Sequence, residues 1–301
     1  RWLIGLEPSL FTPRFFHPFT NTLGFSDNLF GSAPVYILFR ALGFSRELAY
    51  DFWFLVGHVT NYLAAYLVCR RLGISPMGAA FGAFVFAYAL PMLVKAGHAQ
   101  LLYRFAAPFA LLAVWRLFER RRLIYLGAAA FWVAVQFYLT IYQGLFLLML
   151  LAAFAVYLFV VERHVLIAQM LAGLRQEKRG ALALCGTVLV LSAAATILLF
   201  AGYWMVARQY GFGRPIQVLA ELSPRIGSYF VSDNAFSAII GRLVQVPSRG
   251  EQQLFLGAGV WLLVIAGTIA VLKGAAPNRL GWALGISALA LFLVTLNIDG
   301  L

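Results

Sequence analysis

The sequence predicts an all-α polytopic membrane protein, a single transmembrane bundle of about eight helices over residues 1–301. Hydrophobic residues make up 62% of the chain, charged residues 11%, and the mean hydropathy is +0.85. Soluble domains are about half apolar and a quarter charged, so the solvent for most of this chain is lipid. Two long polar stretches, 1–51 and 207–253, interrupt the apolar runs, and we expect both to be loop regions outside the membrane.

Each apolar run is long enough, or nearly so, to cross a hydrocarbon core about 30 Å thick. Residues 123–161 carry no charge, and as one helix of about 1.5 Å per residue they would span nearly twice that thickness, so we expect a fold-back near Gln143-Gly144. Polar residues inside the runs, such as His58, Asn61 and Gln136, are expected to hydrogen-bond to neighbouring helices. The predicted spans are 52–69, 77–94, 101–118, 123–142, 144–161, 181–206, 254–272 and 280–298.

The charges predict which ends of the spans face the cytoplasm. Twelve of the 23 Lys and Arg residues fall in four short connections, each separated from the next by two spans: 70–76, 116–122, 162–180 and 273–279. By the positive-inside rule this end is cytoplasmic. Eight of the eleven acidic residues lie on the opposite, outer face: Glu7, Asp27, Glu47, Asp51, Glu221, Asp233, Glu251 and Asp299.

The two outer regions are expected to contain short amphipathic helices. In the first region, Ser32 and Pro34 open an apolar segment that Gly43 closes, which is typical of a short helix. In the second, residues 235–246 alternate polar and apolar residues as a surface helix does. Long loops beside a membrane domain usually have a function, so we look for chemistry here.

Asp27, in Phe25-Ser26-Asp27-Asn28, is the candidate catalytic carboxylate. A carboxylate close to the membrane can accept a proton from a hydroxyl or help hold a divalent cation. The alternative is a helix cap or Asx-turn, which the neighbouring Ser and Asn favour. His17, before Pro18, is a candidate phosphate contact, with a turn residue as its alternative.

The segment 95–104 is the candidate substrate-binding site. Arg104 lies about one turn into an apolar span, where an ionisable group needs an anion or a water-filled cavity. If this segment is helical, Gln100 and Arg104 lie four residues apart on one wall with His98, and Lys95 joins them near the outer leaflet, where a lipid phosphate lies. The alternative is that the cations extend to the headgroups without binding a substrate.

Arg225, in the turn signal Ser223-Pro224-Arg225, is a further candidate phosphate contact, and a solvated cap on the bundle is its alternative. The net charge of +12 does not indicate nucleic-acid binding, because the basic residues are scattered between spans. The sequence contains no P-loop, dinucleotide fingerprint or zinc-protease motif, so nucleotide hydrolysis is not encoded in it.

Several stretches resemble bacterial multi-pass proteins of the GT-C glycosyltransferase type, including YfhO-like proteins, over nearly the whole chain. The resemblance rests on these segments: Phe16-His17-Pro18, Asn21 through Asp27, Ala49-Tyr50-Asp51, Arg70 through Gly73, Gly82 through Ala87, Gly97 through Gln100, Gly250-Glu251 and Leu256-Gly257.

This resemblance implies a polyprenyl-phosphate-sugar donor in the outer leaflet and an acidic catalytic residue in the first outer loop. In such proteins that acid often belongs to a Gly-Asp pair near the loop's upstream helix, and this chain begins after that position, which leaves Asp27 or Glu7 as second choices. We therefore expect the chain to be part of a longer protein. The cofactor is left open, with a divalent cation as one option.

With the resemblance, which implies glycosyl transfer with inversion, these observations lead us to expect a glycosyltransferase of the bacterial inner membrane and cell envelope. It would move one hexose or pentose from a polyprenyl-phosphate carrier to an extracytoplasmic glycan, lipid or protein acceptor. Two alternatives stay open: a transporter or flippase of a lipid-linked envelope intermediate, which needs polar residues deep within the spans, and a non-catalytic envelope assembly protein.

Overall fold

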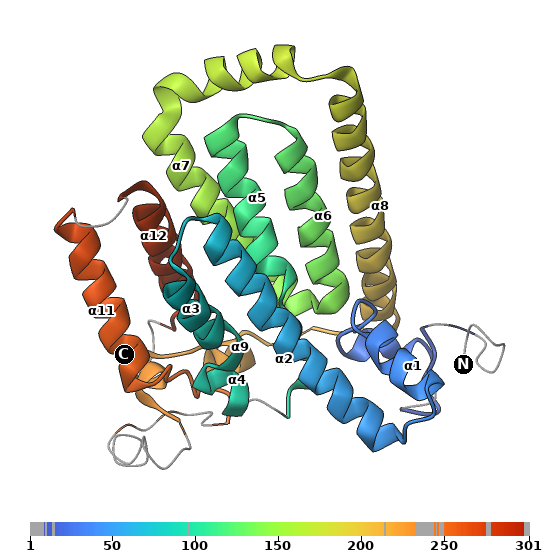
Figure 1. Ribbon diagram of the computed structural model, residues 1–301. Helices are drawn as coiled ribbons and strands as arrows, with labels where there is room; N and C mark the ends of the chain where they lie inside the picture. Colours follow the sequence, from blue (N-terminus) through green and yellow to red (C-terminus); the bar gives the residue numbers. More distant parts are fainter. Residues whose placement is uncertain are drawn as a thin grey trace. The chain divides into compact units, whose positions relative to one another are not determined.

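The computed structural model describes residues 9, 11–13, 16–94, 97–213, 215–232, 244, 246, 250–274 and 278–297. Every secondary-structure element in this described part of the chain is a helix, which confirms the all-α prediction (Figure 1). The chain divides into two compact units. Unit 1 comprises 1–57, 103–146 and 173–213, and unit 2 comprises 58–102, 147–172 and 214–301.

The predicted spans correspond one to one with apolar helices of the described chain. Five helical segments are long and apolar enough to cross a membrane, and three apolar helices of 10–17 residues occupy the other three runs. The five are α2 (Arg46–Arg71), α3 with α4 (Pro76–Tyr88 and Leu90–Val94), a segment from Ala99 that contains α5 (Ala106–Arg120), the start of α7 (Ile141–Gln176) and α8 (Arg179–Tyr210). The three are α6 (Ile124–Leu139), α11 (Ala258–Leu272) and the part Arg279–Thr295 of α12 (Asn278–Thr295).

In unit 1, α6 packs between α5 and α8, and the antiparallel course of α5 and α6 is visible in Figure 1. Small residues let these helices approach closely, as is usual where lipid supplies no hydrophobic drive for helix association. Ala106, Ala110 and Ala113 are buried on α5. A Cβ on Gly127 of α6 would lie 3.3 Å from Sγ of Cys185 in α8, so this glycine sits at the point of contact.

Helix α1 (Ala33–Ala41) confirms the short helix predicted in the first loop region. Ser32 is its N-cap residue and Pro34 lies in its first turn. Gly43 has φ 92°, in the left-handed region that glycine adopts without a steric cost.

The fold-back in the charge-free stretch lies at Thr140 and not at Gln143-Gly144 as the sequence analysis expected. Thr140 is extended, with φ −166° and ψ 129°, and separates α6 from α7. Gly144 serves the corner in another way, because a Cβ there would lie 2.5 Å from Cδ1 of Phe137. The missing side chain lets the first turn of α7 pack against the end of α6.

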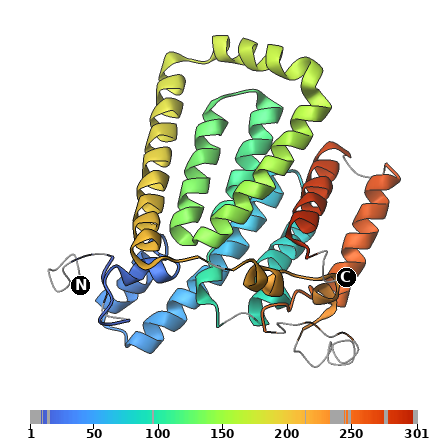
Figure 2. The same ribbon diagram turned by 180° about the vertical axis from the view of Figure 1, so that it is seen from behind.

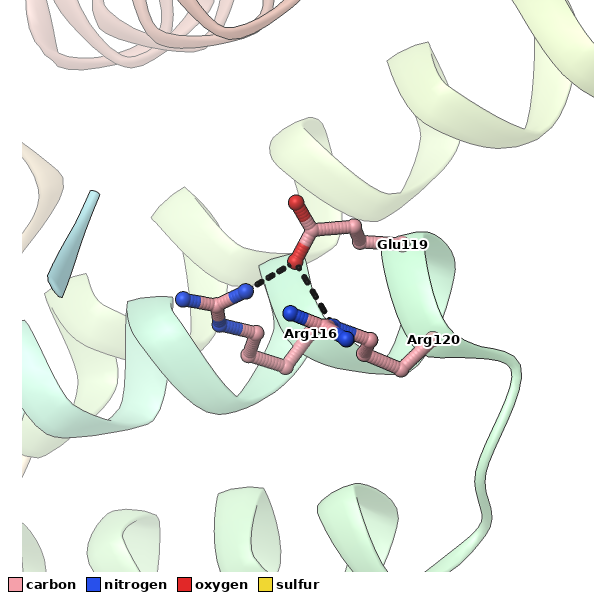
Figure 3. A network of polar contacts seen from close by, with 3 residues as sticks. All are labelled: Arg116, Glu119 and Arg120. Atoms are coloured by element: carbon pink, nitrogen blue, oxygen red, sulfur yellow. Dashed lines mark hydrogen bonds and ion pairs between the residues drawn. The ribbon is translucent and has the colours of Figure 1, made fainter. Parts of the chain in front are cut away.

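The two ends of unit 1 differ in charge. At one end Glu119 forms ion pairs with Arg116 and Arg120 on α5 (Figure 3), and Nε of Arg122 lies 3.4 Å from Oε1 of Glu177. The basic connections 116–122 and 162–180 therefore meet there, as the alternation of spans predicts. The connection 162–180 is itself largely helical, since α7 continues to Gln176 and changes direction sharply along its length (Figures 1 and 2).

In unit 2, a buried histidine compensates for the break that a proline makes between α3 and α4. Pro91 has no N–H, so the carbonyl of Ala87 lacks its usual helical donor. Nδ1 of His58 lies 3.1 Å from that carbonyl oxygen, and the His58 ring stacks on Tyr88 with centroids 5.0 Å apart. The imidazole therefore satisfies a carbonyl that proline leaves without a donor.

Two further polar side chains in the spans act in the same way. Nδ2 of Asn61 donates to the carbonyl of Leu102 at 2.7 Å within unit 2. In unit 1, Nε2 of Gln136 donates to the carbonyl of Tyr103 at 3.0 Å. For His58, Asn61 and Gln136, the expectation that polar residues in the spans hydrogen-bond to neighbouring segments is confirmed.

Candidate functional site

The described part of unit 2 contains one group of side chains arranged for proton transfer, centred on His98. Nε2 of His98 lies 3.3 Å from Oε1 of Glu251, and Nδ1 lies 3.5 Å from Nε2 of Gln100. The side chains of His98 and Glu251 are 43% and 42% exposed. An imidazole with a carboxylate on one nitrogen, accessible to a ligand, is the usual arrangement of a histidine base and the residue that orients it.

His98 is held by a short 3₁₀ turn. The turn η3 (Ala99–Leu101) follows it directly, and the His98 carbonyl accepts the N–H of Leu101 at 2.9 Å. The prediction that 98–104 begins a helix is wrong, because α5 begins only at Ala106. Gln100 and Arg104 thus do not share a helical face, although Gln100 does lie beside His98, as predicted.

Glu251 is placed by its buried neighbour Gln252. Nε2 of Gln252 donates to the carbonyls of Glu221 and Ser223, at 2.7 and 3.1 Å, and its Oε1 accepts from Oγ of Ser228 at 3.0 Å. These partners belong to the end of α9 (Ile216–Leu222) and to η4 (Ile226–Phe230). A fully bonded, buried amide rigidifies the backbone next to the carboxylate.

The contacts of His98 are compatible with one tautomer of the imidazole. With the amide oriented as given, Nε2 of Gln100 is a donor, so Nδ1 of His98 is the acceptor and Nε2–H faces Glu251. Nδ1 then carries the lone pair, and a bound hydroxyl that displaces the amide of Gln100 can give its proton to this nitrogen. The imidazolium formed would stay beside the Glu251 carboxylate, which stabilises it.

Arg225 belongs to the same loop structure of unit 2. Its backbone N–H donates to Oγ of Ser228 at 2.9 Å, and the atom Nε of its guanidinium is buried with no hydrogen-bond partner among the described residues. Arg104, in unit 1, is half-buried just before α5. Lys95 lies outside the described residues. The predicted roles of these cations in phosphate binding stay predictions.

In unit 1, Asp27 is buried at the corner between α6 and α7. Its Oδ1 accepts the backbone N–H of Ile141 at 2.7 Å, and its Oδ2 accepts the hydroxyl of Thr140 at 3.1 Å. Ile141 is the first residue of α7, so Asp27 caps this helix from a distant part of the chain and lies at the positive end of its dipole.

The residues after Asp27 complete the corner. Nδ2 of Asn28 donates to the carbonyl of Phe137 at 3.1 Å, and the N–H of Gly31 donates to the carbonyl of Tyr138 at 2.7 Å. Oδ1 of Asn28 accepts the N–H of Phe30, which is an Asx-turn. The capping alternative for Asp27 thus matches its contacts, while its catalytic role stays a prediction.

Burial raises the pKa of the Asp27 carboxyl, and the hydrogen bonds from Ile141 and Thr140 oppose that rise. The net rise of the pKa means that desolvation of the carboxylate outweighs the two hydrogen-bond donors. A carboxylate with a raised pKa is a better proton acceptor, which is compatible with the predicted role of general base.

His17 is exposed in a turn at residues 16–18, in line with the turn alternative. Nearby, the hydroxyl of Tyr203 on α8 donates to the carbonyl of Ser26 at 2.7 Å. Tyr203 also lines an apolar groove of about 580 Å³ on the face of α8, whose other lining residues are Ile197, Phe200, Ala201, Trp204 and Ala207. The groove therefore lies next to the segment that carries Asp27.

Glu251 is one of the carboxylates predicted for the outer face, but its pairing with His98 was not predicted. The two residues are far apart in sequence, and only the general acidity of the outer loops pointed to it. Among the described residues, no group of three or more His, Cys, Asp and Glu side chains could hold a metal ion.

The comparisons with known proteins give a family but no activity. No curated protein and no solved structure matches the chain. The family model described as a domain of unknown function, DUF6311, matches residues 5–298. The chain therefore belongs to the DUF6311 family, and that match extends over all the helices described above.

Proposed function

We propose that this chain is the membrane domain of an inverting glycosyltransferase that moves one sugar from a polyprenyl-phosphate donor to an extracytoplasmic acceptor. The observation that carries the proposal is the accessible pair of His98 and Glu251, 3.3 Å apart, in the loop region of unit 2. Transfer to a hydroxyl requires one group that removes a proton as the new bond forms, and this pair is suited to that step.

In the proposed reaction the acceptor hydroxyl attacks the anomeric carbon of the sugar, and the bond from that carbon to the phosphate oxygen breaks. Nδ1 of His98 takes the proton of the hydroxyl, and Glu251 stabilises the resulting imidazolium. The polyprenyl phosphate leaves as an anion, with no additional reactant required. Proton transfer of this kind contributes about 10²- to 10⁴-fold to a rate.

The donor has a charged phosphate head and a long apolar isoprenoid tail, and the protein has residues suited to bind each of them. The cations predicted for the phosphate are Lys95, Arg104 and Arg225, because guanidinium and ammonium groups bind phosphate oxygens well. Unit 1, taken by itself, has an apolar groove on α8 beside Tyr203 and a second candidate base, Asp27, whose neighbour Ser26 accepts the hydroxyl of Tyr203.

The transporter alternative receives less support from the buried polar residues. His58, Asn61 and Gln136 each bond to a backbone carbonyl, which gives them a structural role. A transporter uses such residues to line a substrate path. A non-catalytic assembly protein would not need the exposed pair of His98 and Glu251.

We further propose that the loop regions face the outside of a bacterial inner membrane. Support comes from unit 1, where the basic connections gather at one end of the helices and Asp27 lies at the other. Thiol labelling of Ser26→Cys and Lys178→Cys in intact cells tests this orientation. Labelling of Ser26→Cys alone by an impermeant reagent is expected, and the reverse pattern would contradict the assignment.

The reaction is tested with purified protein in nanodiscs, a radiolabelled polyprenyl-phosphate sugar and a membrane extract as the source of acceptors. We expect label transfer by the wild type and a loss of about 10²-fold or more in Glu251→Gln and His98→Asn, from the missing proton transfer. Glu221→Gln is the matched control, because only the backbone carbonyl of Glu221 takes part in the loop structure.

Two further variants test the sites predicted from the sequence. Asp27→Asn and Arg104→Ala are expected to lower transfer if these residues act as base and phosphate ligand. If both keep full activity, these two assignments are wrong although the reaction can stand. If no variant, including His98→Asn, differs from the wild type, the proposed proton transfer is wrong.

A further inference from the structure

Unit 1 presents a cluster of five aromatic rings where the first loop region meets the end of α8. We call this cluster the aromatic knob; it consists of Phe16, Phe19, Phe25, Tyr210 and Phe212. Phe16, Phe19 and Phe212 are 59%, 54% and 50% exposed. Large apolar side chains that gather on a surface mark an interaction site, whereas single exposed ones need no explanation.

The knob is built around Phe25. The Phe25 ring lies 4.9 Å from that of Phe212 and 5.0 Å from that of Tyr210, both close to perpendicular. The rings of Phe16 and Phe19 lie 5.6 and 6.1 Å from Phe25. Aromatic pairs at such distances attract one another beyond the effect of buried area.

Polar contacts fasten the same loop to α8. The hydroxyl of Tyr210 donates to the carbonyl of Thr20 at 2.8 Å, and Nδ2 of Asn21 donates to Oε1 of Gln209 at 3.0 Å. Gly24 lies against Val206, where a Cβ would come within 2.7 Å of Cγ2. The exposed phenylalanines thus stand on a firmly attached loop, and their outward position is built into the fold.

The knob continues the lipid-facing surface of α8. On this helix Leu198 and Trp204 are strongly exposed, as expected for side chains that face acyl chains. The guanidinium of Arg208 lies 4.3 Å from the centre of the Trp204 ring, and Trp with Arg is typical of the level where a span leaves the hydrocarbon. The knob begins at Tyr210, less than two turns beyond Trp204.

We infer that the aromatic knob inserts into the interfacial layer of the bilayer and anchors the loop of residues 16–25 to the membrane surface. The partner is therefore phospholipid, at the level of the headgroups and upper acyl chains. The position of the knob directly beyond the exposed Leu198 and Trp204 and the Arg208–Trp204 pair favours lipid as the partner, and each phenylalanine ring leaves water on insertion. The loop that carries Asp27 is then fixed at membrane level and not free in solvent.

The test uses a fluorescent label at Phe16→Cys or Phe19→Cys, in full-length protein with Cys69→Ser and Cys185→Ser, in nanodiscs. Leu198→Cys is the lipid-facing reference and Lys178→Cys the aqueous reference, since Lys178 is exposed between α7 and α8. We expect brominated phosphatidylcholine to quench the labels at 16 and 19 as strongly as at 198, and iodide to quench only the label at 178.

Two results would overturn the inference. Quenching by iodide without quenching by the brominated lipid places the knob in water. Protection from both quenchers shows that protein, such as a second copy, covers the rings. Circular dichroism and the elution volume of each labelled variant verify the fold, and agreement between the labels at 16 and 19 excludes an effect of one substitution.

Discussion

Replacement of Asp27 separates its structural role from a catalytic one. Asp27→Ala removes both acceptors at the start of α7, the one for the Ile141 N–H and the one for the Thr140 hydroxyl. Loss of a helix cap costs about 1 kcal/mol, and a buried hydroxyl left without a partner costs about 1–3 kcal/mol. Thr140 is fully buried, so we expect the free energy of unfolding to fall by about 3 kcal/mol.

Asp27→Asn changes much less. The amide oxygen can still accept the Ile141 N–H, and the amide nitrogen can donate to the hydroxyl of Thr140, so we expect a loss of about 1 kcal/mol. Asp51→Ala is the matched control, because this exposed carboxylate of unit 1 is expected to change stability by less than about 0.5 kcal/mol.

The assay is equilibrium unfolding in mixed micelles with increasing mole fraction of sodium dodecyl sulfate, followed by tryptophan fluorescence. The predicted order of stability is wild type, Asp27→Asn, then Asp27→Ala. If Asp27→Ala is as stable as Asp51→Ala, the corner does not depend on this cap and the structural reasoning fails. If Asp27→Asn is stable but inactive in sugar transfer, the carboxylate itself is needed for chemistry.

Three more predictions concern stability. Since burial raises the pKa of Asp27, the wild type should be most stable below the pKa that this carboxyl has in the unfolded chain, and its free energy of unfolding should fall as the pH rises through the folded pKa, because ionising the buried carboxyl costs free energy. The hydrogen bonds from Ile141 and Thr140 remain in the ionised form. Unfolding at a series of pH values should show this fall in the wild type and not in Asp27→Asn. His58→Phe keeps a ring against Tyr88 but leaves the carbonyl of Ala87 unpaired, so the free energy of unfolding should fall by about 1–3 kcal/mol in the same assay. An unchanged unfolding midpoint would contradict the role given to the imidazole. Gly24→Ala places a Cβ against Val206 and should cost about 1–3 kcal/mol, and a neutral effect would mean that the loop is not held against α8.

The helices could be predicted because each apolar run is close to the length needed to cross a membrane. The apolar composition of the chain then indicates an all-α membrane protein. The corner between α6 and α7 could not be placed, since it depends on Asp27, Asn28 and Gly31, which are distant in sequence. The length of the charge-free stretch required a break near its middle, where Gly144 lies, yet here Gly144 serves close packing on Phe137.

The candidate site was predicted in part. His98 and Gln100 were chosen from the segment 95–104, and they do lie together. The helix assumed for that segment was wrong, because Leu102 and Tyr103 bond through their carbonyls to Asn61 and Gln136 instead of continuing a helix. Glu251 was missed as the partner of His98, because no local pattern links a carboxylate to a histidine so far away in the chain.

The central claim is that His98, oriented by Glu251, accepts the proton of the sugar acceptor. The most direct measurement is the single-turnover rate of sugar transfer from the polyprenyl-phosphate donor by wild type and His98→Asn, each shown to be folded. The account predicts a rate about 10²- to 10⁴-fold lower for His98→Asn, with a similar loss in Glu251→Gln. Equal rates in all three proteins, or no transfer by the wild type with any polyprenyl-phosphate sugar, would contradict it.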